Sequence, residues 1–453
     1  MTRRPAPDAR SVALTVAGSD SGGGAGVQAD CKTIEAAGAF ATSVVTAVTA
    51  QHTRGVESTH VLPTEEVAAQ YDAVVDDFDV GAAKTGMLAT ADVVGLVADR
   101  APDLDAPLVV DPVMVAASGD RLLDPAAEAA YADLVAEATL VTPNADEAAV
   151  LTGVEVTDEE SAAEAGRALV GDGADAALVT GGHVGDGDEV ADVLVTGEGA
   201  ETFRHARVDT AATHGSGCTL SSYVAARLAR GDDLRPAVER GTAYVERAVR
   251  YHLDVGEGPG PVQHLVGLRD RAARQPTAEA VAEVVRGFVE RDVSSLVPEV
   301  GMNVAGATPY AETPGETAAV EGRITRTLSG VAPNRGVRFG ASSHVARFLL
   351  AAREHDPALR FAVNCRFDDD VEAALAVLDG PVSEYDRDAE PPETKADEGS
   401  TMGWGARRAI EAVEDTPVAV VDRGEVGKEA VVKLLATDAD TLSERTVALR
   451  DAL

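Results

Sequence analysis

A short segment rich in small residues, 213–219 (THGSGCT), carries the residue types of a phosphate site directly before a helix-like stretch. The free N–H groups at such a helix start, aided by the helix dipole, would hold a phosphate at Gly215, Ser216 and Gly217. Cys218 would lie in the first turn, where the same field lowers a thiol pKa. A thiolate there could take the proton from an attacking hydroxyl group while the N–H groups stabilise the phosphoryl charge. A buried cysteine behind a glycine cap is the simpler alternative.

A second glycine-rich loop, 18–26, follows an apolar run and precedes a helix-like segment. Its glycines would let the backbone approach a ligand without side chains in the way. A Walker loop is excluded because no Gly-Lys-Ser/Thr follows. A dinucleotide-binding loop is disfavoured because the next strand ends at Gln51 with no acid to hold a ribose hydroxyl. A plain turn needs only one or two glycines, so a ligand-contacting loop is favoured.

Acidic and amide side chains follow two further strand-like segments. Asn144 and Glu147, three residues apart at a strand-to-helix boundary, could share one face and hold hydrated Mg²⁺ beside phosphates. Asp111, directly after 108–110, is another candidate ligand for Mg²⁺. A capping asparagine with an early-turn acid is the common alternative. Because open parallel sheets bind ligands beyond the carboxyl ends of their strands, we expect all these loops to meet at one edge.

The elements that must position these loops alternate apolar runs with helical stretches over residues 1–265, which predicts an α/β unit. The expected strands are 12–17, 43–50, 108–110, 140–142, 177–180 and 190–196, and the expected helices include 64–76 and 126–136. A polar, arginine-rich linker is expected at 266–276. A second, smaller α/β domain is expected over 277–453. Its expected strands are 302–305, 323–325, 361–365 and 418–421, its helices are 277–292, 343–353 and 370–378, and its surface loop is 386–399.

The charge balance of the 453 residues is strongly acidic, with 39 basic and 76 acidic residues, a net charge of -37. Only five of the basic residues are lysine, and the acids are dispersed, which favours a salt-adapted surface and makes nucleic acid and anionic membranes poor partners. No apolar run reaches the roughly 18 residues of a membrane span, and the N-terminus has no apolar signal core. Three scattered cysteines match no zinc or disulfide spacing, so we expect a reducing cytoplasm.

Several segments together resemble the hydroxymethylpyrimidine/phosphomethylpyrimidine kinase family of the ribokinase fold. They are GSDSGGGAGVQAD (18–30), TAQHTRGV (49–56), KTGML (84–88), DPVMVAASG (111–119), TPNADEAAVLTG (142–153), GGH (181–183), THGSGCTLS (213–221) and GPVQHL (260–265). The resemblance implies a ribokinase-like open sheet with flanking helices. It also implies ATP-dependent phosphorylation of the pyrimidine alcohol and then of its monophosphate.

By the same resemblance, Gly18, Asp30, Gln51 and Met87 would line the pyrimidine site, and Cys218 would be the base. The amide of Gln51 suits an aminopyrimidine edge because it both donates and accepts hydrogen bonds. The family commonly has a lysine immediately before Gly-Gly-His, whereas Thr180 stands here. A cation expected near the phosphates is therefore missing, and Lys84 or an arginine would have to replace it. Kinases of this family are commonly dimers or larger, so we expect a homo-oligomer.

Segments 302–324, 340–352 and 422–424 resemble the ThiN-type thiamine-phosphate synthase domain, often fused behind this kinase in archaea. Such a domain would join the pyrimidine diphosphate to thiazole phosphate, with Arg323 and His344 in catalysis. From the residues alone, a serine-capped helix with an exposed histidine explains this region equally well. Similar domains also sense ligands in regulators. The alternative is therefore a pyrimidine or pyridoxal kinase with a non-catalytic sensing domain, and Cys218 argues against a sugar kinase.

Overall fold

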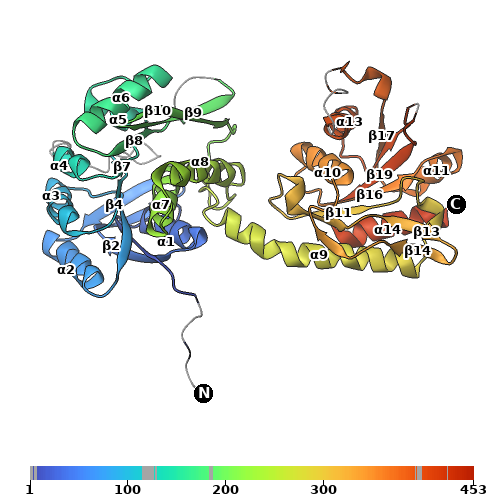
Figure 1. Cartoon of the computed structure of the whole chain (residues 1–453), viewed down its shortest axis with the longest axis horizontal. Coiled ribbons are helices and arrows are strands. Elements are labelled where there is room, and N and C mark those ends of the chain that lie inside the picture. Colours follow the sequence, from blue (N-terminus) through green and yellow to red (C-terminus); the bar gives the residue numbers. More distant parts are fainter. Residues whose placement is uncertain are drawn as a thin grey trace. The chain divides into compact units, whose positions relative to one another are not determined.

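The computed structural model divides the chain into two units, Met1–Gly267 and Leu268–Leu453, each an α/β fold with its own sheet (Figure 1). It describes Arg4 and residues 8–114, 127, 130–182, 187–392, 394, 400–425 and 427–453. The motif residues 115–119 and His183, and parts of the expected helix 126–136 and loop 386–399, lie outside these ranges. In the described part of the chain, no helix combines the length and apolarity needed to cross a bilayer.

The first unit is organised around an eight-stranded sheet with the order β10-β9-β8-β7-β6-β5-β1-β2. Its six strands from β2 to β8 pair in parallel, whereas β9 and β10 are antiparallel additions. The strands are β1 (Val12–Ala17), β2 (Phe40–Val45), β5 (Val80–Thr85), β6 (Leu108–Val110), β7 (Leu140–Val141), β8 (Ala176–Val179), β9 (Glu189–Thr196) and β10 (Gly199–Ala206). A separate antiparallel hairpin consists of β3 (Ala47–His52) and β4 (Gly55–Val61).

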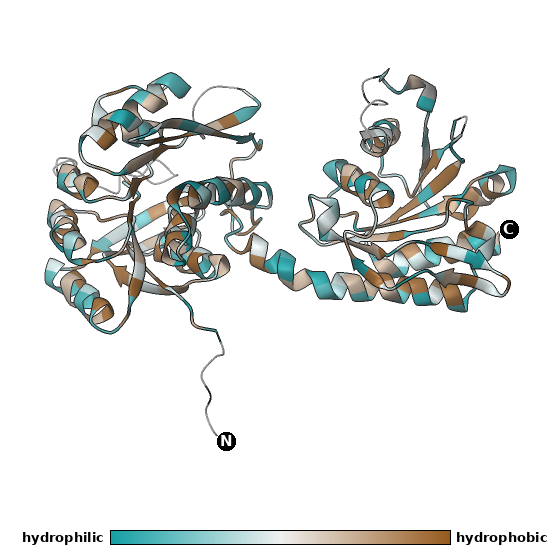
Figure 2. Cartoon of the chain, in the orientation of Figure 1, coloured by the Kyte–Doolittle hydropathy of each residue, from teal (hydrophilic) through white to brown (hydrophobic). Residues whose placement is uncertain are grey.

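Helices cover both faces of this sheet (Figure 1), and its strands are largely hydrophobic (Figure 2). The apolar side chains of the strands are buried. One face packs against α2 (Thr64–Val75), α3 (Ala91–Arg100), α4 (Tyr131–Ala136), α5 (Ala145–Thr152) and α6 (Glu159–Gly171). The other packs against α1 (Gly26–Ala37), α7 (Ser216–Ala229) and α8 (Leu234–Arg250). The sequence did not predict β5, whose small residues lack a strand pattern. Small residues are needed in β5 because α7 packs closely against it: a Cβ at Gly81 would lie 2.9 Å from the carbonyl oxygen of Ala229 in α7.

The second unit has a seven-stranded sheet with the order β15-β12-β11-β16-β19-β18-β17. All neighbours are antiparallel except β17 and β18. The strands are β11 (Val304–Ala307), β12 (Thr317–Val320), β15 (Val337–Phe339), β16 (Phe361–Arg366), β17 (Val382–Tyr385), β18 (Ala419–Asp422) and β19 (Val431–Ala436), and β13 (Ile324–Thr327) with β14 (Gly330–Pro333) forms a hairpin.

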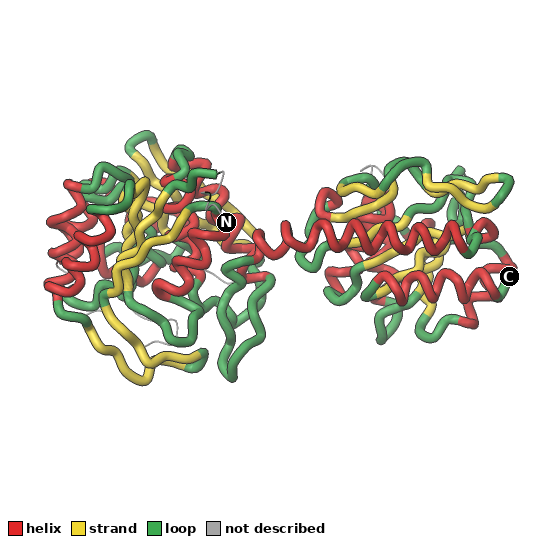
Figure 3. The backbone as a smooth tube through the Cα atoms, turned by 90° about the horizontal axis from the view of Figure 1, so that it is seen from below, coloured by secondary structure: helices red, strands yellow, loops and turns green. Residues whose placement is uncertain are grey.

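The helices of the second unit also form two layers. Helices α9 (Val266–Glu290), α11 (Asp369–Ala374) and α14 (Ala439–Asp451) pack on one face of the sheet, and Figure 3 shows α9 and α14 side by side. Helices α10 (His344–His355) and α13 (Ser400–Glu411) pack on the opposite face.

Two segments of the second part of the chain differ from expectation. Residues 266–276, expected as a linker, form the start of α9, which continues through Pro276. Their polar side chains have partners in the second unit: Asp270 accepts a hydrogen bond from Thr308, and the Arg274 guanidinium lies 3.8 Å from the Phe339 ring centroid. The described part of 386–399 is also not a simple surface loop, because Arg387 is buried.

Candidate active site

A cavity of about 1070 Å³ lies beyond the carboxyl ends of the parallel strands of the first unit. The sequence placed several loops at this edge, and the cavity contains residues from each of them. Of the candidate residues, those lining it are Gly18, Gln51, Lys84, Met87, Asp111, Asn144, Glu147, Thr180, Gly215, Ser216, Gly217 and Cys218. Asp30 is not among the lining residues.

The start of α7 offers free backbone donors to this cavity. Gly215 is the N-cap, with a φ of 83°, and a Cβ there would lie 1.9 Å from the carbonyl oxygen of Gly24, so only glycine fits. The N–H of Ser216 donates to the Thr213 carbonyl at 3.0 Å. The N–H groups of Gly217 and Cys218 have no hydrogen-bond partner among the described residues. Two adjacent free donors at the start of a 14-residue helix form an anion site.

Cys218 does not carry the depressed pKa that its position in the first turn of a helix suggested. Its side chain is partly exposed in the cavity, but burial raises the pKa of the thiol to about 12. Lys84 opposes this shift, while the carboxylates of Asp30 and Asp111 reinforce it. The expected thiolate is therefore wrong for the free protein: desolvation and two nearby acids outweigh the helix start and the lysine.

Asp30 lies behind the cavity wall, so its expected contact with a pyrimidine is also wrong. Its side chain is fully buried and accepts hydrogen bonds from Thr15 Oγ1 at 2.6 Å, Ser222 Oγ at 2.8 Å and Lys84 Nζ at 2.9 Å. Burial alone would lower the pKa of Lys84, but Asp30, with Cys218 and Asp111, outweighs it and raises that pKa. Lys84 is thus held as a cation at the cavity wall.

Asn144 and Glu147 form the capping box of α5 and line the cavity at the same time. The Asn144 side chain accepts from the Glu147 N–H, and the Glu147 carboxylate accepts from the Asn144 N–H, both at 3.0 Å. Burial raises the pKa of Asp111 to about 6 and that of Glu147 to about 8, the latter helped by repulsion from Asp111. A cation between these carboxylates would relieve that repulsion.

Within the described ranges, no group of three or more His, Cys, Asp or Glu side chains could hold a metal ion. Asp111 and Glu147 nevertheless fit Mg²⁺, which binds one or two carboxylates and completes its shell with water and substrate phosphates.

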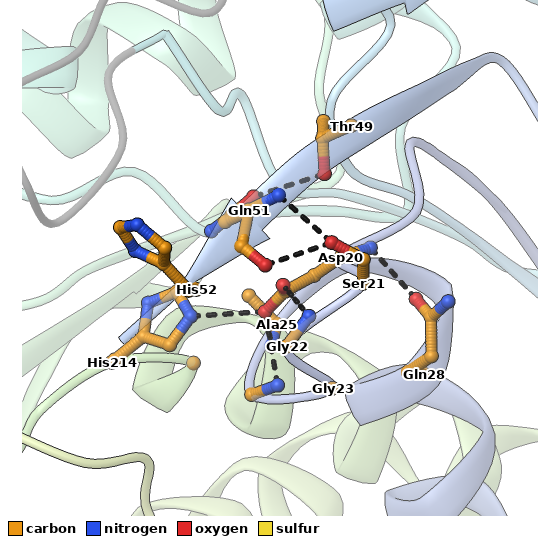
Figure 4. Close-up of polar contacts among 12 residues, drawn as sticks. Asp20, Ser21, Gly22, Gly23, Ala25, Gln28, Thr49, Gln51, His52 and His214 are labelled. Atoms are coloured by element: carbon orange, nitrogen blue, oxygen red, sulfur yellow. Dashed lines mark hydrogen bonds and ion pairs between the residues drawn. The ribbon is translucent and has the colours of Figure 1, made fainter. Parts of the chain in front are cut away.

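Another part of the cavity wall combines the glycine loop with β3 (Figure 4). The N–H of Gly18 donates to the Met87 carbonyl at 3.1 Å, and a Cβ at Gly18 would lie 2.4 Å from Met87 Cε. Gln51 Oε1 accepts from Thr49 Oγ1 at 3.2 Å, and Ser21 Oγ bonds both the N–H and the carbonyl of Gln51. The apolar side chain of Met87 and the amide of Gln51 thus both line the cavity.

Three residues that line the cavity, Asp20, His214 and Arg207, were not predicted as site residues from the sequence. The carboxylate of Asp20 accepts hydrogen bonds from loop N–H groups and from His214 Nε2, which lies 3.0 Å away. An aspartate ahead of glycines signals such a turn, but its histidine partner is 194 positions away. Arg207 donates to the carbonyls of Gly182 and Gly187 at 2.9 and 2.8 Å.

In the second unit, Arg323 and His344 are both exposed. Arg323 packs across Gly301, where a Cβ would lie 2.8 Å from Arg323 Cδ, and Gly301 accepts a hydrogen bond from Asn364 Nδ2. His344 opens α10, and one turn later the ring centroid of Phe348 lies 4.8 Å from Lys433 Nζ.

Asn364 and Lys433 are both buried and are paired across β16 and β19. The same pair adjoins a buried charge cluster that sequence reasoning did not find. Asp422 accepts two hydrogen bonds from Arg387, at 2.7 and 2.6 Å, and others from Tyr385 at 2.5 Å and Lys433 at 3.4 Å.

The chain matches two protein families. The phosphomethylpyrimidine kinase family matches residues 20–263, and the thiamine-phosphate synthase ThiN family matches residues 280–448. A hydroxymethylpyrimidine/phosphomethylpyrimidine kinase of Streptomyces coelicolor is 48% identical over 265 residues, which cover 58% of this chain and 98% of that protein. The thiamine biosynthesis bifunctional protein ThiED of Geobacter sulfurreducens is 46% identical over 269 residues, covering 59% and 55% respectively.

Solved structures share the fold of the first unit. The Bacillus subtilis pyridoxal kinase, in an ADP complex, has a TM-score of 0.54 at 33% identity and covers 58% of this chain and 99% of its own. The Staphylococcus aureus pyridoxal kinase in complex with AMP-PCP and pyridoxal has a TM-score of 0.52 at 29% identity, covering 57% and 94%. The ribokinase-like fold expected from the sequence is confirmed.

Removal of the Asp30 carboxylate tests the buried ion pair. Asp30→Ala would leave a buried ammonium uncompensated, so we expect the first unit to lose about 3–5 kcal/mol of unfolding free energy. Glu35→Ala, on the same helix but at an exposed pair with Arg10, should cost less than about 1 kcal/mol. Urea unfolding of the whole chain measures both. Equal effects of the two substitutions would contradict the role given to Asp30.

The protonation state of Cys218 can be measured by alkylation. Because its pKa is raised to about 12, the free protein should carry a thiol at neutral pH. We expect the iodoacetamide rate at Cys218, followed by peptide mass spectrometry, to keep rising to at least pH 10. A plateau below pH 8 would show that the helix start does stabilise the thiolate.

Proposed function

Because the chain belongs to the phosphomethylpyrimidine kinase family, we propose that its first unit transfers the terminal phosphoryl group of ATP to a hydroxymethylpyrimidine and then to the monophosphate formed. The proposal rests on one observation: a single cavity is lined both by Met87 and Gln51 and by Gly217 and Cys218, whose N–H groups are free. An acceptor hydroxyl and a transferred phosphoryl group can therefore meet there.

Position and positive charge are the main contributions that this chain makes to the transfer. Phosphoryl transfer passes through a loose transition state that needs little help from a base. The free N–H groups at the start of α7 and the cation Lys84 stabilise charge on the moving group. Cys218 enters the reaction as a thiol, so a role as base would first require loss of its proton. Mg²⁺, held by Asp111 and Glu147, would neutralise charge on the ATP phosphates.

The second phosphorylation needs a substitute for the lysine replaced by Thr180. Thr180 lies in the cavity wall, bridged to Asn144, and brings no charge. Arg207 lines the same cavity and carries a guanidinium group. We assign it the role of this cation; its guanidinium also donates hydrogen bonds to the carbonyls of Gly182 and Gly187.

The second unit is proposed to join the pyrimidine diphosphate to thiazole phosphate, forming thiamine phosphate and releasing diphosphate. The ThiN match over residues 280–448 supports this, as does a relative named as a bifunctional thiamine biosynthesis protein. Arg323 and His344 are the proposed catalytic residues. Their positive charge could stabilise the departing diphosphate as positive charge develops on the pyrimidine methyl group.

The alternative is a pyridoxal kinase whose second unit only senses a ligand. The similarity of the first unit to two solved pyridoxal kinases supports this alternative. The two readings are separated by one reaction containing the protein, Mg²⁺-ATP, hydroxymethylpyrimidine and thiazole phosphate, analysed by mass spectrometry. Thiamine phosphate is the expected product. Pyrimidine phosphates without thiamine phosphate would contradict catalysis by the second unit. No phosphorylated pyrimidine would contradict the kinase assignment and favour pyridoxal.

The acidic composition supports a further proposal, that the protein is salt-adapted and works in a salty cytoplasm. The proposal of a homo-oligomer rests on the family resemblance alone. A net charge of -37 makes the folded surface repel itself, and salt screens that repulsion.

Substitutions in the second unit separate the two activities. Arg323→Ala and His344→Ala should each slow thiamine phosphate formation by about 100-fold or more, because each removes a group that stabilises transition-state charge. Pyrimidine phosphorylation should be unchanged. Arg326→Ala on β13 and His355→Ala at the far end of α10 are matched controls at exposed positions. Product analysis measures all four variants, and full synthase activity in His344→Ala would contradict its assignment.

Screening of surface repulsion should make stability depend on salt. We expect the Tm to rise steadily as potassium chloride increases from about 0.1 M, where the Debye length is near 10 Å, into the molar range. An uncharged osmolyte at matched osmotic pressure is the control, since it cannot screen charge. A Tm that does not change with salt, or that rises equally with the osmolyte, would contradict salt adaptation.

A further inference from the structure

A polar clasp joins the two glycine-rich loops of the first unit. His214 Nε2 lies 3.0 Å from Oδ2 of Asp20, whose side chain is 2% exposed (Figure 4). The same carboxylate accepts hydrogen bonds from the N–H groups of Gly22, Gly24 and Ala25, at 2.7, 2.9 and 2.8 Å. Burial raises the pKa of Asp20, but the His214 and backbone hydrogen bonds outweigh it and keep that pKa low. An ionised carboxylate is therefore the centre of the clasp.

The two ends of this clasp belong to two loops that both line the cavity. In one loop, His214 directly precedes Gly215, the N-cap of α7, and its carbonyl accepts a hydrogen bond from the Val262 N–H. In the other, Asp20 is followed by Ser21, whose hydroxyl bonds both backbone groups of Gln51. The clasp is thus the side-chain link between the phosphate-binding helix start and the strand that carries the proposed pyrimidine-reading amide.

The packing around the clasp leaves little freedom for the two loops to shift while it is closed. A Cβ at Gly24 would lie 2.5 Å from Cδ2 of His214, so the imidazole lies directly on the glycine loop. Loss of the imidazole would remove both this contact and the charged hydrogen bond. The glycine loop itself would keep its shape, because Asp20 retains its three backbone donors. A change at His214 therefore removes the side-chain link between the loops, while the backbone contact of Gly215 with Gly24 and the shape of the glycine loop remain.

We propose that His214 is a positioning residue, whose bond to Asp20 holds the start of α7 in register with the pyrimidine side of the cavity. The inference rests on the proposed kinase function of the first unit. Its physical basis is that an in-line transfer tolerates little misplacement: a shift of about 1 Å in the attacking geometry can cost about 100-fold in rate. Substrate affinity depends on each loop separately and changes far less.

The test compares His214→Leu, which removes the donor, with His214→Gln, whose amide can still donate to Asp20. We expect the leucine variant to lose about 10- to 100-fold in kcat for pyrimidine phosphorylation, with KM for the pyrimidine within about threefold. It should also form more ADP per phosphorylated pyrimidine, since a loosened site admits water as acceptor. Glutamine should restore most of kcat and the coupling ratio. A purely structural role would produce neither the split nor the rescue.

His52→Leu is the matched control, because this histidine lies beside the clasp in Figure 4 but pairs with Glu57 on the exposed hairpin. We expect its kcat within about threefold of the parent protein. The proposal is overturned if His214→Leu keeps its kcat, if only KM rises, or if glutamine fails to rescue. If His214→Leu does not fold, His214→Asn takes its place in the comparison, because its side-chain amide is shorter than that of glutamine.

The substrate that the unsubstituted protein phosphorylates tests the proposed kinase function independently of the His214 variants. If it phosphorylates pyridoxal in place of the pyrimidine, the kinase assignment fails, and the same variant ratios measured with pyridoxal still test the clasp.

Discussion

The buried ion pair between Asp30 and Lys84 determines where the catalytic elements of the first unit can lie. Asp30 projects from α1, while its three donors, Thr15, Lys84 and Ser222, come from β1, β5 and α7. One carboxylate therefore ties two strands to two helices directly beneath the cavity. A buried charge without its partner is strongly destabilising, so none of these elements can move independently of the others. The free donors at the start of α7 owe their position to this arrangement.

The same arrangement explains how a strongly acidic protein can bind ATP. The donors at the start of α7 are backbone groups, which need no basic side chain and do not change with pH. Lys84 and Arg207 are basic side chains that line the same cavity, and Asp30 compensates the charge of Lys84. The nearby carboxylates of Asp30 and Asp111 also disfavour a thiolate, and they contribute to the high pKa of Cys218. Positioning of the substrates, rather than a strong base, is what this geometry favours, and the clasp between Asp20 and His214 belongs to that positioning.

The local sequence pattern predicted those strands and loops whose structure depends mainly on neighbouring residues in the chain. The bounds of β1 and β6 agree with the sequence prediction, as does the gathering of the glycine-rich loops at one cavity. Strand β5 was not predicted because its small residues are required by the packing of α7 against the strand, and this contact leaves no periodic pattern in the local sequence. Asp30 was misplaced and His214 overlooked for a related reason: their roles depend on partners 54 and 194 positions away. The pKa of Cys218 likewise depends on neighbours that only the folded chain brings together.

The central claim is that one cavity brings a pyrimidine alcohol to a phosphoryl group held by the start of α7. A crystal structure with hydroxymethylpyrimidine and a non-hydrolysable ATP analogue tests it most directly. The account predicts the terminal phosphate on the N–H groups of Gly217 and Cys218, with the ring between Met87 and Gln51 and its hydroxyl facing that phosphate. A terminal phosphate bound elsewhere, or a ring outside this side of the cavity, would contradict it.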